Sequence, residues 1–99
     1  MGIQSLKGKI ANDIWKKGGS KKIPKALHKR AKQLLEIMNS SSKLENLKIL
    51  GSPPDIKLHK LSGNFKHYWS LTLNRSYPWR IIFIFSKGEF IDVEITDYH

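Results

Sequence analysis

The sequence predicts an α+β fold in which two N-terminal helices pack on a twisted, mainly antiparallel sheet. Apolar residues recur at helical spacing in the first part of the chain and alternate like strands from Ile56 onward. Between the two parts lies a run of turn-forming residues, GSPPD at Gly51–Asp55. Short turns then separate the strands, as in an antiparallel meander. A chain of 99 residues supports one core, so we expect a single domain over residues 1–99.

The first helix is indicated by Leu6, Ile10 and Ile14, which recur every four residues beside Trp15. It should end at Gly18-Gly19, because glycine readily takes the left-handed conformation that follows a helix.

The second helix should begin at Pro24, whose missing N–H costs nothing in a first turn. The run NSSS at residues 39–42 should end it. One apolar face is expected to pack on the core, and it consists of Leu27, Ala31, Leu34, Leu35 and Met38.

The strands follow a connector over residues 43–55. Ile56–Leu61 reads as a short strand, and Ser62-Gly63-Asn64 reads as a turn. His67–Asn74 alternates, with Trp69, Leu71 and Leu73 on one face.

The next strand, WRIIFIF at Trp79–Phe85, is apolar on both faces except at Arg80, so it should be central in the sheet. Lys87-Gly88 predicts a tight hairpin, and Phe90–Thr96 is the returning strand.

The last hairpin brings the end of the chain to Arg80. If Ser86 faces Glu89, regular pairing sets Arg80 opposite Ile95 and Trp79 opposite Thr96. Asp97 and Tyr98 should then emerge beside the start of the strand that carries Arg80. Two interpretations stay open: a structural ion pair between Arg80 and Asp97, or a phosphate-binding arginine with the Tyr98 phenol and the His99 imidazole near it.

A second polar cluster lies in LHKLSGNFKHYW, residues 58–69. Cations contact phosphates and aromatic rings stack on unpaired bases, so interleaved basic and aromatic residues suit nucleic acid. This interpretation assigns RNA contacts to Lys60 and Tyr68. The alternative is a solvated hairpin, which we prefer for His67 and leave open for His59.

Composition limits the function classes. The chain has 18 Lys+Arg against 8 Asp+Glu, a formal net charge of +10, which favours a polyanionic partner. It has no cysteine, so disulfides and thiolate chemistry are excluded. No apolar run predicts a signal peptide or membrane span, so we expect a cytoplasmic protein without a membrane partner. The four histidines lack metal-binding spacing, and we expect neither metal nor cofactor.

Basic side chains also gather in the helical part, where opposing acids are scarce. We expect them to form a positive surface for ribosomal RNA, although a solvated helix face would look the same. They are Lys16, Lys17, Lys21, Lys22, Lys25, Lys29 and Arg30.

Taken together, LHKLSGNFKHYWSLTLN, then WRIIFIF, then the closing DVEITDYH resemble the HigB branch of the RelE/ParE toxin superfamily. The early IQSLKGKIANDIWKKG (residues 3–18) resembles the family's first strand and helix, so Ile3–Leu6 is also a candidate strand. Two positions depart from the family pattern. Ser62 stands where a lysine is usual, and the loop at residues 74–79 is longer.

The resemblance implies an mRNA interferase, a toxin that cuts messenger RNA in the ribosome. Its implied partners are the ribosome, mRNA, and a HigA-like helix-turn-helix antitoxin through which it meets operator DNA. Carried over residue by residue, the implied catalytic set is His59, Lys66, Arg80, Asp97, Tyr98 and His99.

The chemistry needs no metal, because the ribose 2′-OH of RNA is itself the nucleophile. Arg80 and Lys66 suit charge stabilisation, and His59 suits proton transfer near neutral pH. Regular pairing, however, puts His59 opposite His67, about 17 Å along the strands from Arg80. Either the register differs, or sheet twist brings both ends together, or the two clusters do different work.

Two other functions stay open. One is a ParE-like inhibitor of DNA gyrase, which cuts nothing. The other is a non-catalytic RNA-binding or ribosome-binding protein.

Overall fold

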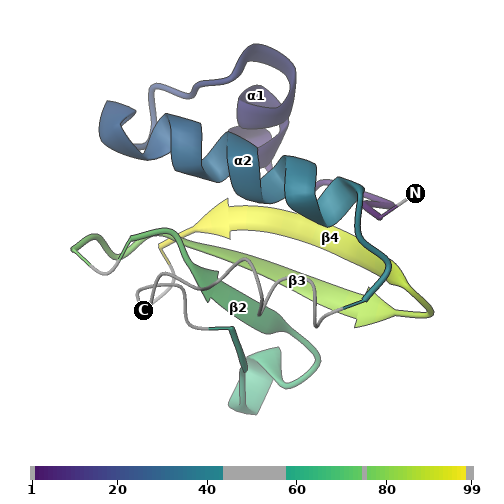
Figure 1. Cartoon of the computed structure of the whole chain (residues 1–99). Coiled ribbons are helices and arrows are strands. Elements are labelled where there is room, and N and C mark those ends of the chain that lie inside the picture. Colours follow the sequence, from purple (N-terminus) through teal and green to yellow (C-terminus); the bar gives the residue numbers. More distant parts are fainter. Residues whose placement is uncertain (1, 44–57, 75, 98–99) are drawn as a thin grey trace.

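The computed structural model describes residues 2–43, 58–74 and 76–97, and it shows two helices on one face of a sheet (Figure 1). The helical elements are α1 (Lys9–Lys17), the short 3-10 helix η1 (Lys25–Leu27), α2 (His28–Asn39) and the 3-10 turn η2 (Gly63–Phe65). The strands are β1 (His59–Lys60), β2 (Trp69–Thr72), β3 (Arg80–Ser86) and β4 (Glu89–Thr96). The predicted α+β class is confirmed.

Helix α1 ends as the sequence predicts. Gly18 takes the left-handed conformation at φ 77°, and its N–H donates to the carbonyl of Ile14 at 2.9 Å. Lys16 and Lys17 occupy the last turn, where the helix dipole favours cations. The helix begins at Lys9, after Leu6, because the preceding segment joins the sheet instead.

The second helix was expected to begin at Pro24, but the 3-10 helix η1 follows Pro24 and α2 begins only at His28. Helix α2 ends at Asn39, where the run NSSS begins. Its predicted apolar face is buried. Ala31, Leu35 and Met38 are fully covered and Leu34 is 3% exposed. Each fully buried leucine or methionine contributes about 1.5–3 kcal/mol of transfer free energy.

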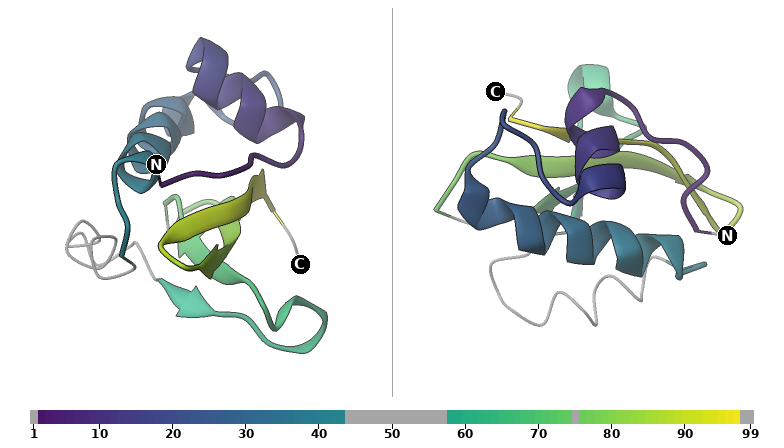
Figure 2. Two further views of the ribbon diagram at one scale, coloured as in Figure 1. Left: turned by 90° about the vertical axis from the view of Figure 1, so that its right-hand side faces the viewer. Right: turned by 90° about the horizontal axis from the view of Figure 1, so that it is seen from above.

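The four strands lie in the order β1-β2-β3-β4, and every neighbouring pair is antiparallel. Strand β3 is therefore interior, as its apolar sequence predicts. Figure 2 shows both helices on the same side of this sheet. Leu71, Ile81, Phe83, Val93 and Ile95 point into the shared core with them.

The N-terminal segment runs parallel to β4, through bridges from Ile3 to Phe90 and from Leu6 to Val93. This confirms the strand-like interpretation of Ile3–Leu6. The segment covers the middle of an otherwise open edge, which protects those backbone groups from pairing with another chain.

Strand β4 contains a β-bulge, which regular antiparallel pairing does not predict. Between Ile82 and Ile84 of β3 there is one residue, whereas the facing part of β4 holds two, and Asp92 has φ 51°. As a result Arg80 faces Thr96, and the predicted pairing of Arg80 with Ile95 is wrong by one residue. The predicted Ser86–Glu89 pair is correct.

The first strand also differs from prediction. Residues 56 and 57 lie outside the described part, and within it β1 comprises only His59 and Lys60. His59 faces Ser70, so the expected pairing with His67 is wrong. The turn η2 takes up residues that regular hairpin pairing would have assigned to the ladder.

Candidate functional site

Arg80 opens β3 on the face of the sheet turned away from the helices, which we call the outer face. Cross-strand partners share a face, so Thr72, Arg80 and Thr96 form one row across it. Ser70 and Ile82 lie in the next row.

The Arg80 guanidinium is held in place by its neighbour. Its Nη1 donates to Oγ1 of Thr72 at 2.7 Å, and Thr72 is only 5% exposed. Arg80 itself is half-buried. A charge-assisted hydrogen bond of this length orients the planar guanidinium, and a guanidinium fork matches the geometry of phosphate oxygens.

Strand β4 brings Thr96 and Asp97 to the same place. Thr96 faces Arg80 across the ladder, and the exposed Asp97 follows directly. Tyr98 and His99, the other two closing residues of the implied catalytic set, lie outside the described residues.

His59 lies nearer to Arg80 than regular pairing predicts. It faces Ser70, two residues along β2 from Thr72, and Arg80 is two strands away. Two residue steps and two strand spacings place the Cα atoms of His59 and Arg80 roughly 12 Å apart. The first of the three explanations, a different register, thus removes much of the predicted separation.

Lys66 is not brought to Arg80. It follows η2, an exposed turn at the end of β2 opposite Thr72. Lys60 is exposed on β1, with its Nζ 5.8 Å from the ring centroid of Trp69. Tyr68 is half-buried. These residues form a group of their own at the β1–β2 turn.

The turn also carries Ser62 and His67. Ser62, at the position where the family usually has lysine, is exposed in extended backbone before η2. His67 is exposed, consistent with the solvated surface histidine that we preferred.

A polar group that the sequence did not single out is Ser70, on the outer face. Its side chain is fully buried, and its Oγ has no hydrogen-bond partner within the described part of the chain. A buried hydroxyl without a partner costs about 1–3 kcal/mol. Sequence alternation places Ser70 on the same face as Thr72, but the burial of that face is not visible in the pattern.

The predicted basic surface of the helical part is exposed at six of its seven positions, and Arg30 is half-buried. Lys16 and Lys17 close α1, Lys25 lies in η1, and Lys21 and Lys22 lie in the segment between the helices. The remaining pair, Lys29 and Arg30, lies in the first turn of α2.

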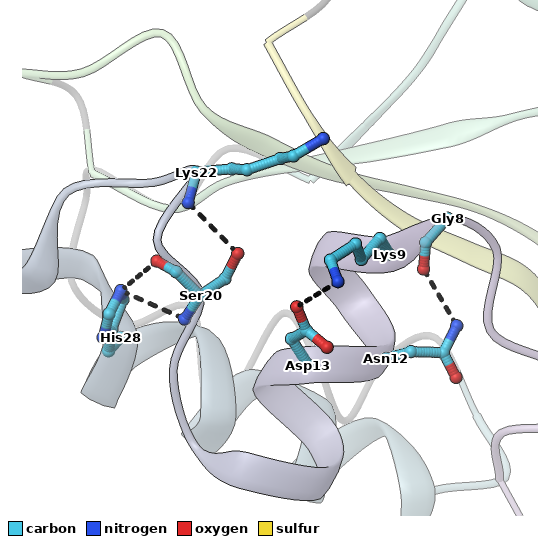
Figure 3. Close-up of polar contacts among 7 residues, drawn as sticks. All are labelled: Gly8, Lys9, Asn12, Asp13, Ser20, Lys22 and His28. Carbon is cyan, nitrogen blue, oxygen red and sulfur yellow. Dashed lines mark hydrogen bonds and ion pairs between the residues drawn. The ribbon is translucent and has the colours of Figure 1, made fainter.

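The basic surface includes a cavity. Lys17, Lys21 and Lys22 line it together with Lys9, which the sequence interpretation missed because Lys9 is distant in sequence from the lysine run. His28 also lines it, and its ring binds the backbone of the intervening segment (Figure 3).

No group of three His, Cys, Asp or Glu side chains capable of holding a metal occurs among residues 2–43, 58–74 and 76–97. In the same ranges, no helix is long and apolar enough to cross a membrane.

Two comparisons with known proteins bear on this site. The family model described as "RelE-like toxin of type II toxin-antitoxin system HigB" matches residues 4–99. A curated relative, the Endoribonuclease HigB of Proteus vulgaris, is 29% identical over 97 residues, which cover 98% of this chain and 99% of the relative.

Proposed function

Because this chain belongs to the HigB-like family of RelE-like toxins from type II toxin–antitoxin systems, we propose that it is an endoribonuclease that cuts mRNA in the ribosome. The family implies a cognate antitoxin. The Proteus vulgaris relative carries the name of an endoribonuclease, which supports the activity.

The observation that carries the proposal is the orientation of Arg80. A guanidinium fixed by Thr72 at 2.7 Å, beside the strand from which Asp97 emerges, is preorganised for a phosphodiester. Such fixed charges lower a barrier because they need no rearrangement when negative charge develops on the phosphate oxygens.

The reaction is an internal transfer. The ribose 2′-oxygen attacks the adjacent phosphorus while its proton passes to a base, and the bond from phosphorus to the 5′-oxygen breaks. The departing 5′-oxygen takes a proton from an acid. The products are a 2′,3′-cyclic phosphate and a 5′-hydroxyl, and no metal ion takes part.

Proton transfer is assigned to His59 and to the closing residues Tyr98 and His99, with Asp97 as an orienting carboxylate. A separation of roughly 12 Å between the Cα atoms of His59 and Arg80 allows both to act on one phosphodiester. Lys66 lies at the far turn, so we assign it to RNA contact together with Lys60 and Tyr68 rather than to the reacting phosphate.

The proposed partners follow from this reaction. The ribosome holds the message, and the exposed lysines of the helical part contact ribosomal RNA. A HigA-like helix-turn-helix antitoxin neutralises the toxin and carries it to operator DNA. The site of action is the cytoplasm, where translation takes place.

The test is primer extension on a message translated in vitro, with wild type, Arg80→Ala and Arg80→Lys. Wild type should cut the message and leave a 2′,3′-cyclic phosphate. Arg80→Ala should cut at least 100-fold more slowly, and Arg80→Lys should be intermediate because it keeps the charge without the fork.

Removal of Tyr98-His99 should also abolish cleavage. If both Arg80→Ala and the truncated chain remain folded and cut normally, the residue assignment is wrong. Intact message together with an SOS response in cells would instead identify a gyrase inhibitor. Ribosome binding by wild type without any cut would identify a non-catalytic binding protein.

A further inference from the structure

A cavity of about 570 Å³ lies in the helical layer, between α1, the segment of residues 19–22 and the start of α2. Its volume is within the range of roughly 300–1,000 Å³ typical of small-molecule sites. Arg80 lies on the outer face of the sheet, whereas this cavity belongs to the opposite layer, so one nucleotide cannot occupy both.

The segment that forms one wall is fixed by several contacts (Figure 3). Nε2 of His28 donates to the carbonyl oxygen of Ser20 at 2.8 Å and lies 3.3 Å from that of Ile23. The N–H of Lys22 donates to Oγ of Ser20 at 3.3 Å. Ser20 itself is 5% exposed. The wall is therefore built from packed, hydrogen-bonded backbone.

Gly19 is required by this arrangement. A Cβ at residue 19 would lie 2.8 Å from Nδ1 of His28, closer than real contacts allow. The absence of a side chain lets the segment pack directly on the imidazole ring. The same contact makes Gly19 a means of altering the cavity without changing any charge.

The charge of the lining is strongly positive. Lys9, Lys17, Lys21 and Lys22 face a single acid, Asp13, whose Oδ2 is 3.9 Å from Nζ of Lys9. Lys9 and Lys17 come from α1, and Lys21 and Lys22 come from the segment of residues 19–22. Lysine stems, a glycine and the His28 ring give the lining its apolar surface. A phosphate attached to a flat, partly apolar body matches this combination.

We propose that this cavity is a second RNA subsite, which holds an unpaired nucleotide by its phosphate while the base lies against the lining. The inference rests on the proposed function, because it assumes that RNA is the partner. A compact cavity favours a single nucleotide over an acidic peptide, which would need an extended groove or a sheet edge. The cavity would bind RNA without taking part in the reaction, and the reacting phosphate would lie at Arg80.

The binding test uses a short fluorescein-labelled single-stranded RNA, with anisotropy measured across a salt series. All variants carry Arg80→Ala, so that the site of the reacting phosphate contributes little, and the RNA contacts of the β1–β2 turn are the same in every variant. Affinity for RNA falls as salt rises, and each phosphate contact steepens this fall by about 0.7 in a plot of log affinity against log salt. Lys21→Ala/Lys22→Ala removes two such contacts, so the plot should become less steep by about 1.4. If the two proteins bind RNA equally at 1 M salt, the double variant should bind roughly tenfold more weakly than its parent at 0.15 M salt.

The matched control is Lys7→Ala/Lys43→Ala, which removes the same charge from two exposed lysines outside the lining. It should change affinity less than threefold. Equal losses in both double variants would show a general charge effect and would overturn the proposed cavity.

Two further variants separate shape from charge. Gly19→Ala should weaken RNA binding with every charge kept, and Asp13→Asn should strengthen it because the lining loses its acid. Circular dichroism verifies the fold of each. If Gly19→Ala does not fold, Asp13→Asn decides alone, and unchanged affinity in that variant contradicts the proposal.

The same series with a poly-glutamate peptide as probe tests the alternative partner. If the peptide binds as tightly as RNA and loses affinity in the same variants, the cavity takes an acidic protein and not RNA. The cleavage test is independent. If wild type cuts mRNA while the lysine variants bind normally, this inference alone fails. If RNA binding depends on the cavity but no message is cut, the proposed function alone fails.

Discussion

The sharpest prediction concerns Thr72, whose hydroxyl accepts a hydrogen bond from Arg80 at 2.7 Å while the residue is 5% exposed. Thr72→Val removes the acceptor and keeps the shape. A hydrogen bond to a charged group contributes about 1.5–3 kcal/mol. Because Arg80 is half-buried, water can replace part of the lost hydrogen bond. The loss of the guanidinium's fixed orientation should therefore cost about 1.4–2 kcal/mol. If that cost falls on the transition state, cleavage should slow by roughly 10- to 30-fold.

The assay is a single-turnover time course of message cleavage on purified ribosomes, followed by primer extension. Thr72→Ser should retain most of the activity, because the hydroxyl remains and only a methyl group is lost. Thr96→Val is the matched control, since Thr96 flanks Arg80 from the other strand and undergoes the same chemical change. We expect less than a threefold effect there.

The reasoning would be refuted if Thr72→Val cut as fast as wild type while Arg80→Ala was inactive. Arg80 would then act without the orientation that Thr72 provides. Equal slowing by Thr72→Val and Thr96→Val would contradict it as well, because a general disturbance of the strands would explain both. Thermal unfolding of each variant separates loss of fold from loss of rate.

Three further predictions concern stability, all measured by urea unfolding. Ser70→Ala should stabilise the protein by about 1 kcal/mol because it removes a buried hydroxyl without a partner in the described part of the chain; a loss of stability would mean that the hydroxyl is used. Lys32→Met should destabilise by about 1–2 kcal/mol, since Nζ of Lys32 donates to the carbonyl of Trp15 at 2.6 Å and lies 4.3 Å from its ring centroid. Ser5→Ala should cost about 1–2 kcal/mol, because Oγ of Ser5 accepts the N–H of Asp92 at 2.8 Å and donates to its Oδ1 at 3.2 Å. Unchanged stability in either variant would contradict the role of that contact.

The elements were predictable because local chemistry marks them. Gly18 ends α1 because it takes the left-handed conformation. The alternation of apolar residues in β2 indicates that one face of the strand packs on the core. Lys87 and Gly88 form the hairpin turn, with φ 52° and 80°. The neighbourhood of Arg80 and Asp97 was also predictable, because a short hairpin forces its two strands together.

Cross-strand register was not predictable in the same way. The pairing of His59 with Ser70 depends on how η2 uses the residues of the turn, which no local rule specifies. The hydrogen bond from Arg80 to Thr72 depends instead on the pairing of β2 with β3, which joins these two residues directly. Lys9 lines the cavity in the helical layer only because α1 packs beside the segment of residues 19–22.

The bulge in β4 connects register with chemistry. Phe90, Val93 and Ile95 all face the core, which regular alternation cannot achieve because Phe90 and Val93 are three residues apart. An extra residue at Asp92, held by Ser5 from the far end of the sequence, restores the pattern. Without it, regular pairing from Phe90 would turn Val93 and Ile95 to the outer face, with Ile95 opposite Arg80, and their apolar side chains would leave the core. The conflict between Phe90 and Val93 is readable in the sequence, so the bulge follows from the apolar pattern of β4. Arg80 faces outward for a separate reason, because its neighbours Ile81 and Phe83 in β3 face the core.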